Sequence, residues 1–394
     1  MLKPINLLCH DSIEPLGVDD LSPTFSWQTA SDTVGGTQAA YQIRVIKADA
    51  PCDLLWDSGK VFSDTSVGIC YSGLPLIERT AYIWQVRQWD NSGKVGNWSE
   101  PARFETGLMG HFCGKWIGPL EDSKTWRLPD PLPAPMLRKS FFLNLKAKSA
   151  RVYICGLGYH KLFVNGKNVS DTLLAPTVSQ YNEKIYYETL DITDLLAEGE
   201  NVFGVILGNG WYNSYTKDPW NFAEAPWRDR PKLWLEAYIE LENDESVAVI
   251  SDHTWRFSTG PIIADGLRHG EVYDARLEKN GWSSPGYDDK DFFPVQIKRS
   301  PGGILGSRQI TPIRKVETLK AVKIYHHGNG MCVYDFGKNI SGYVRIHAKG
   351  YDGAQIVFRY SERIDENFNI NREKNFGIYI QRRISNRPIY NAGK

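Results

Sequence analysis

The chain has 394 residues, enough for roughly two to four domains of ordinary size. Lys plus Arg number 46 and Asp plus Glu also number 46, so the formal net charge is zero. Because binding to nucleic acid or to an acidic membrane surface relies on excess positive charge, we expect neither kind of partner. The 13 Trp and 20 Tyr suit a β-sandwich core and sugar stacking equally well.

Six cysteines are scattered along the chain, without a C-x-x-C pair. Most lie in apolar runs, as Cys155 does in Val152–Cys155, which predicts buried, reduced thiols. The first residues show no basic segment followed by an apolar one, and no stretch approaches about 18 apolar residues. We therefore expect a cytoplasmic protein. The histidines lack the spacing of zinc ligands, and no glycine-rich phosphate loop or nucleophile elbow is present.

The first unit is expected over residues 1–108. Tyr41–Ile46 and Tyr82–Trp89 alternate between apolar and polar residues, which predicts two strands with one buried face. The second of these leads into Asp90–Gly93, a turn in which Asn or Gly can adopt positive φ. With the Trp98-Ser99 motif that follows, the pattern is similar to a fibronectin type III-like sandwich.

The proline-rich stretch Leu128–Pro135 predicts a stiff linker within residues 109–136. A second unit is expected over residues 137–300. There the Asn-Gly pair in Val164–Lys167 favours a type I′ hairpin turn. Short strands separated by such turns predict a jelly-roll-like sandwich, interrupted by one helical turn at Asp191–Ala197.

A third unit is expected over residues 301–394. Val333–Phe336, Gly342–Ile346 and Ala354–Tyr360 are predicted strands, with glycine turns between them. So few strands leave a sheet edge and a half-covered core, which indicates an incomplete β-sandwich. The whole chain is therefore predicted to be all-β.

An ordered set of motifs lies in the second and third units, within a stretch of similarity that covers about residues 5 to 371. It comprises Ala150–Tyr153, Val164–Lys167, Leu174–Pro176, Tyr186–Leu196, Leu207–Tyr212, Ser251–Arg256, Gly270–Arg276, Tyr334–Asn339 and Tyr360–Asp365. In order and rough spacing the set resembles the non-catalytic N-terminal β domains of glycoside hydrolase family 78, the bacterial α-L-rhamnosidases. The resemblance implies a carbohydrate-binding-like jelly roll over the second unit and a concanavalin-like sandwich in the third.

Full-length members of that family hydrolyse terminal non-reducing α-L-rhamnosyl residues with inversion, using two carboxyl groups in an (α/α)6 barrel. No segment of this sequence resembles the barrel. The resemblance therefore implies a chain truncated before its catalytic domain, inactive alone, with no catalytic residue and with the barrel as its natural intramolecular partner. We expect an accessory or sugar-binding role toward rhamnose-containing glycans or glycosides. The alternative is a stand-alone carbohydrate-binding or structural β-sandwich protein.

The loop 218–229 concentrates Trp, acidic and Asn side chains between two predicted strands. Some family members bind rhamnose with calcium in this region, and hard cations prefer clustered oxygen ligands. The resemblance implies that Asp171, Asn221 and the carbonyl of Pro226 could hold Ca²⁺, while Trp220 or Trp227 stacks on the sugar. No other cofactor is implied.

The same loop also has a purely structural interpretation. Arg228 and Arg230 would pair with Asp229 and Glu224, and the Trp residues would merely anchor the loop.

Two further positions have structural and functional interpretations. Trp211 follows a glycine-hinged turn, so it is either a core residue or a platform facing a sugar. Glu271 and Asp274 stand three apart in an expected strand, where they would face opposite sides. We expect this pair to brace the jelly roll rather than to catalyse a reaction.

Overall fold

The computed structural model describes residues 2–50, 52–120, 132–215, 220–268, 270–308, 310–328, 330–347, 349–351 and 353–370. Strands dominate these residues. Their helical structure is limited to the 3₁₀ turns η1 (Thr193–Leu195), η2 (Phe222–Glu224) and η3 (Ala275–Leu277). The all-β prediction is confirmed. No helix in the described part of the chain is long and apolar enough to cross a membrane.

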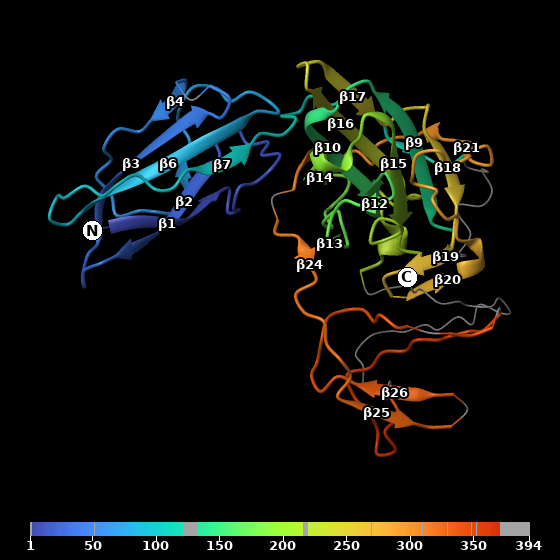
Figure 1. Cartoon of the computed structure of the whole chain (residues 1–394). Helices are drawn as coiled ribbons and strands as arrows, with labels where there is room; N and C mark the ends of the chain where they lie inside the picture. Colours follow the sequence, from blue (N-terminus) through green and yellow to red (C-terminus); the bar gives the residue numbers. More distant parts are fainter. Residues whose placement is uncertain are drawn as a thin grey trace.

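The first lobe contains two antiparallel sheets (Figure 1). One holds β1 (Leu2–Cys9), β2 (Thr24–Ser31) and β5 (Ile69–Cys70); the other is ordered β4 (Leu54–Asp57), β3 (Gln38–Lys47), β6 (Ala81–Asp90) and β7 (Ala102–Glu105). Alternation along β6 explains the core, because Tyr82, Trp84 and Val86 are at most 1% exposed. Both strands predicted from alternation in this lobe, 41–46 and 82–89, lie within β3 and β6.

The second unit is a sandwich of two larger sheets. The first runs β22 (Gln296–Ile297), β8 (Ile117–Gly118), β16 (Lys232–Leu241), β10 (Ala147–Leu157), β14 (Lys184–Asp191) and β23 (Ile304–Ser307), with β17 (Ser246–Ile250) also on β16. The second runs β12 (Lys167–Asn168), β11 (Tyr159–Val164), β15 (Gly199–Gly208), β9 (Pro135–Leu143), β18 (Arg256–Thr259) and β21 (Phe293–Pro294). Aliphatic residues such as Val152, Val205 and Leu235 fill the space between them.

The outer face of the first of these sheets carries a second, aromatic core. Tyr153, Tyr187 and Trp234 lie on its strands, and Tyr181 and Tyr212 reach them from loops. All five are at most 1% exposed. Since this layer covers the sheet, the loops after β15 and before β16 pack over it, and these loops form the candidate site.

The hairpin predicted at Val164–Lys167 is confirmed. β11 pairs with β12, and Asn165 and Gly166 have φ of 50° and 80°, as a type I′ turn requires. The predicted helical turn is η1, where Asp191 Oδ1 accepts a hydrogen bond from Thr193 N at 2.9 Å.

The proline-rich stretch expected as a linker lies mostly outside the described residues. β9 begins at its last proline, Pro135. β8 lies within the range expected for the linker, yet Ile117 pairs with Leu233 of β16.

The third unit differs from the prediction. Beyond the pairing of β13 (Thr172–Leu173) with β24 (Ile313–Arg314), it shows β25 (Lys323–His326) paired with β26 (Cys332–Asp335). In Figure 1 this hairpin lies apart from the second unit. The predicted strands 342–346 and 354–360 do not form among the described residues. Their apolar side chains, such as Tyr343 at 65% and Val357 at 60% exposed, have no sheet to pack on.

The prediction that the cysteines are buried is correct only in part. Cys9 and Cys155 are buried, but Cys52, Cys70 and Cys113 are exposed, so the expectation of burial is wrong for these three. Cys70 illustrates the reason, because β5 is a two-residue edge strand that covers little of its own side chains. All six cysteines are unpaired.

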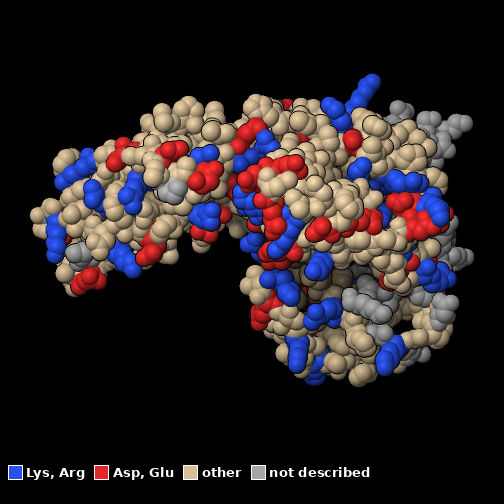
Figure 2. Space-filling view, turned by 45° about the horizontal axis from the view of Figure 1, so that its top comes forward, with Lys and Arg blue, Asp and Glu red and all other residues tan. Residues whose placement is uncertain are grey.

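The first lobe is fixed to the second unit by a polar seam, defined here by Asp19, Glu105, Arg151 and Tyr187. Arg151 Nη2 on β10 contacts Glu105 Oε2 on β7 at 2.9 Å. Asp19 Oδ1 accepts from Tyr187 Oη at 2.7 Å, and Asp19 Oδ2 accepts from Ser307 N at 2.8 Å. Figure 2 shows charged side chains of both signs crowded where the elongated lobe meets the body of the molecule.

Candidate functional site

The site begins at the turn after β15. Asn209 is 4% exposed, and its backbone N donates to Asp265 Oδ2 at 2.8 Å. Its side-chain Nδ2 donates to Asp265 Oδ1 at 2.8 Å, and its Oδ1 accepts from Asn213 Nδ2 at 2.6 Å. These bonds fix the turn, and therefore Trp211, against the hairpin of β19 (Ile262–Gly266) and β20 (Gly270–Tyr273).

Two carboxyl groups face each other across that hairpin. Asp265 is the direct cross-strand partner of Glu271, so both side chains lie on one face. Burial raises the pKa of Asp265, although the hydrogen bonds from Asn209 oppose this. The pKa of Glu271 is raised by desolvation first and by the charge of Asp265 second. Sequence reasoning missed Asp265, because nothing local marks a residue whose partner lies 56 positions away.

The spacing of Glu271 and Asp274 predicted that their side chains would not converge, and they do not. Asp274 caps η3 instead, and its Oδ2 contacts Arg276 Nη2 at 2.6 Å. The hydrogen bond from Arg276 lowers the pKa of Asp274. The bracing role expected for this pair stays a prediction.

The loop side chains gather into an aromatic cluster, defined as Trp211, Trp220, Phe222 and Trp227. The centroid of Trp211 lies 6.1 Å from Trp220 and 5.3 Å from Phe222, and Phe222 lies 6.3 Å from Trp227. The three Trp residues predicted to bind sugar are thus brought together. Phe222 was missed, although its place between Trp220 and Trp227 in the sequence is a signal for it.

Members of the cluster differ in exposure. Trp220 is 59% exposed, whereas Trp211 and Trp227 are half-buried. Trp227 packs edge-on against Tyr181 of the aromatic core, with 6.0 Å between centroids. Its Nε1 is buried and has no hydrogen-bond partner among the described residues. Trp227 therefore anchors the loop, while Trp220 presents a ring to solvent.

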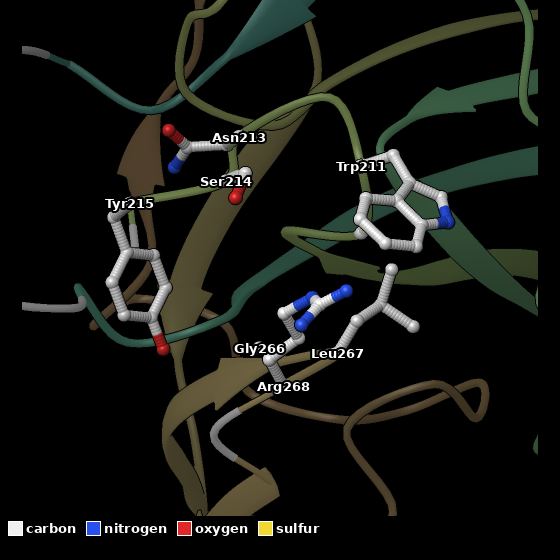
Figure 3. Close-up of a pocket in the computed structure, with 8 residues that line it drawn as sticks. Trp211, Asn213, Ser214, Tyr215, Gly266, Leu267 and Arg268 are labelled. Carbon is white, nitrogen blue, oxygen red and sulfur yellow. The ribbon is translucent and has the colours of Figure 1, made fainter. Parts of the chain in front are cut away.

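A small pocket opens beside the cluster (Figure 3). It is lined by Gly210, Trp211, Asn213, Ser214, Tyr215, Gly266, Leu267 and Arg268. The Arg268 guanidinium lies 4.9 Å from the centroid of the Trp220 ring, a cation–π contact. In Figure 3 the Arg268 side chain lies between Tyr215 on one side and Trp211 on the other. The pocket thus combines ring surface with hydrogen-bond donors and acceptors.

For Arg228, the partners found differ from the ion pairing expected in the structural interpretation of this loop. Arg228 Nε donates to Asn213 Oδ1 at 3.3 Å, and its Nη1 donates to the carbonyl of Ala223 at 3.2 Å. Asp229 pairs with Lys232 at 2.7 Å. Burial lowers the pKa of Arg228. Arg228 therefore links the turn after β15 to the backbone at Ala223.

Of the three residues predicted to hold calcium, two lie in one loop and the third makes an ion pair elsewhere. Asn221, with φ of 55°, precedes η2, and Pro226 follows that turn in the same exposed loop. Asp171 Oδ1 instead contacts Arg314 Nε at 3.0 Å, which compensates its charge. The described residues include no group of three His, Cys, Asp or Glu side chains that could hold a metal ion. Calcium binding stays a prediction.

Three family models match this chain. They are the Rha78A-like N-terminal immunoglobulin domain over residues 4–110, the alpha-L-rhamnosidase N-terminal domain over 145–317, and the bacterial alpha-L-rhamnosidase concanavalin-like domain over 325–386. A curated alpha-L-rhamnosidase of Formosa agariphila is 33% identical over 375 residues, which cover 89% of this chain and 39% of that protein. The chain therefore spans about two fifths of the length of this relative.

Two solved structures of alpha-L-rhamnosidases are also similar to this chain. The alpha-L-rhamnosidase from Dictyoglumus thermophilum superposes with a TM-score of 0.78 at 36% identity, over 86% of this chain and 38% of that one. The Streptomyces avermitilis alpha-L-rhamnosidase complexed with L-rhamnose gives a TM-score of 0.86 over 94% and 52% of the two chains. At 24% identity, this second likeness shows the fold alone.

Proposed function

Since this chain belongs to the α-L-rhamnosidase family through its N-terminal β domains, we propose that it supplies the non-catalytic, sugar-binding part of such an enzyme. The complete protein would hydrolyse terminal α-L-rhamnosyl residues, as the names of its relatives indicate for them. The sugar would bind at the aromatic cluster and the pocket beside it.

The observation that carries the proposal is the exposed ring of Trp220 next to polar groups. The C–H face and methyl group of a 6-deoxysugar pack well on an aromatic ring, and its hydroxyl groups need hydrogen-bond partners. Arg268, Asn213 and Ser214 offer such partners along the pocket wall. The Trp220 ring packs against Trp211 and Phe222, with 6.1 Å between the ring centroids in each pair.

The carboxyl groups described here do not suit catalysis of this reaction. An inverting glycosidase holds two carboxyl groups about 6.5–9.5 Å apart, with space for the sugar and a water molecule between them. Asp265 and Glu271 are instead directly opposite on neighbouring strands. Asp265 also accepts two hydrogen bonds from Asn209, which hold its carboxylate against the turn after β15.

Two measurements on the purified chain test the proposal. Calorimetric titration with L-rhamnose should give a saturable heat, and p-nitrophenyl α-L-rhamnopyranoside should release no nitrophenol above buffer. Turnover by the chain would contradict the non-catalytic role. Repeating the titration with EGTA tests calcium. Loss of binding there, reproduced by Asp171→Asn, would assign Asp171 as a ligand, and loss in Asn221→Ala would do the same for Asn221.

A second candidate function is a purely structural support. The anchoring of Trp227 against Tyr181 and the polar seam favour it, because both show side chains used for packing. An absence of heat with L-rhamnose, with and without calcium, would support this alternative.

A further inference from the structure

The outward face of the β4-β3-β6-β7 sheet in the first lobe carries a continuous stack of cations and aromatic rings. We call it the ladder face; in order it comprises Phe62, Lys60, Trp89, Arg87, Trp98 and Arg44. Lys60 Nζ lies 4.7 Å from the ring centroid of Phe62 and 4.8 Å from that of Trp89. The guanidinium carbons of Arg87 and Arg44 lie 4.7 Å and 4.4 Å from the Trp98 centroid.

The alternation of β3 and β6 places these residues outward. Positions with even numbers on β6, such as Trp84, enter the core, so Arg87 and Trp89 face solvent. The register pairs Arg44 with Gln85 and Arg87 with Gln42. The stack is therefore built on β3 and β6, the two strands that alternation in the sequence predicted.

Each guanidinium is held by a neutral partner. Gln85 Oε1 accepts from Arg44 Nε at 3.1 Å and Nη2 at 2.6 Å. Gln42 Oε1 accepts from Arg87 Nε at 2.9 Å and Nη2 at 2.6 Å. Both side chains are thus fixed in orientation, while Nη1 of each has no partner among the described residues. An Arg held in this way loses less conformational entropy on binding an anion.

The positive charges of the ladder face are not compensated by ion pairs. Asp57 is the acid opposite Arg44, but its Oδ1 accepts from Gln42 Nε2 at 2.6 Å and from Gly59 N at 2.8 Å. Within the described structure, neither guanidinium nor Lys60 makes a salt bridge. Arg103 on β7 adds a further exposed cation to the same face.

We propose that the ladder face binds an acidic polysaccharide, with sugar carboxylates on Arg44 and Arg87 and sugar rings on exposed aromatic surface such as Phe62, which is 80% exposed. Charge-assisted bonds to carboxylates suit the unoccupied Nη1 groups. A nucleic acid is disfavoured, because the chain has no net charge and no basic run. This surface lies on a different unit from Trp220, so the proposal goes beyond L-rhamnose binding.

Affinity electrophoresis of the full chain through gels that contain polygalacturonate tests the proposal, with dextran as the neutral control. The chain should be retarded by polygalacturonate and not by dextran, and retardation should weaken as salt rises. The double variant Arg44→Gln/Arg87→Gln should bind at least about tenfold more weakly, a loss of about 1.4 kcal/mol. The control is Lys167→Gln on β12 of the second unit, which also replaces a cation with a neutral Gln. It should bind like the parent chain.

Because the double variant could unfold the lobe, Arg103→Gln provides a second test. Its side chain is exposed and makes no hydrogen bond or ion pair among the described residues, so the fold should survive. It should weaken retardation by about threefold. Equal retardation of Arg103→Gln and Lys167→Gln, or equal binding of a poly(dT) oligonucleotide and polygalacturonate, would overturn the proposal. Trp220→Ala should leave retardation unchanged, which separates this surface from the L-rhamnose site.

Discussion

Tyr187 Oη donates a hydrogen bond to Asp19 Oδ1 at 2.7 Å, and this bond joins β14 of the second unit to the first lobe. The same Asp19 oxygen accepts from Met109 N at 2.9 Å, and the other accepts from Ser307 N at 2.8 Å. One carboxylate therefore holds three segments that are distant in sequence. Asp19 was not identified from the sequence, because its partners are known only once the units are packed.

Tyr187→Phe should lower the free energy of unfolding by about 1–3 kcal/mol, since it leaves a partly buried carboxylate with one donor fewer. Thermal or urea unfolding measures this. The control is Tyr153→Phe, whose ring centroid lies 5.8 Å away and whose buried hydroxyl has no partner among the described residues. That change should be neutral or stabilising. Equal losses in the two variants would contradict the role of Asp19.

Gly17→Ala should weaken the seam between the first lobe and the second unit. Gly17 has φ of 77°, and an added Cβ would overlap Thr189 Oγ1 on β14. Gly35 has nearly the same φ, 76°, but nothing within 4 Å of the added atom. Both variants carry the strain of positive φ, about 1 kcal/mol. Gly17→Ala should therefore have a melting temperature clearly below that of Gly35→Ala; equal values would show that the two units do not touch there.

Acid should destabilise the protein through His160. Its side chain is 3% exposed, its Nδ1 accepts from Gly156 N at 3.1 Å, and its Nε2 lies 3.2 Å from Glu188 Oε2. Burial, and then the charge of Arg308, lowers the pKa of His160 to about 3. The unfolded chain, with a pKa near 6.5, therefore binds the proton more readily. This contribution to stability is complete above about pH 6.5 and falls by up to about 1.4 kcal/mol per unit as pH drops toward 3.

His160→Gln should flatten that part of the pH dependence, as urea unfolding at pH 7, 6, 5 and 4 would show. His253→Gln is the matched control, because His253 is exposed. A His160→Gln profile parallel to that of the parent chain would assign the acid sensitivity to other groups.

Elements whose pattern is local could be predicted from the sequence. Alternation fixes the strands around Ile43 and Trp84, and the Asn165-Gly166 pair supplies both positive φ values of its turn. The loop that holds Trp220 and Trp227 was also recognised from composition. In each case the deciding interaction lies within a few residues of the pattern.

Relationships that depend on distant partners could not be predicted. Asp265 and Asn209 meet only because the turn after β15 packs against the end of β19, and Arg268 reaches Trp220 from the same hairpin. The extended segments 342–346 and 354–360 carry strand-like sequence but find no pairing strand among the described residues. A strand pattern predicts a propensity, and the pairing partner decides whether the strand forms.

Trp220 and its neighbours are proposed to bind L-rhamnose. Calorimetric titration of L-rhamnose into Trp220→Ala, beside Phe142→Ala as a control, tests it most directly. Phe142 is 70% exposed on β9, so both variants remove an exposed aromatic ring from the second unit. We predict at least about tenfold weaker binding for Trp220→Ala and parental affinity for Phe142→Ala. Parental affinity in both variants would contradict the claim.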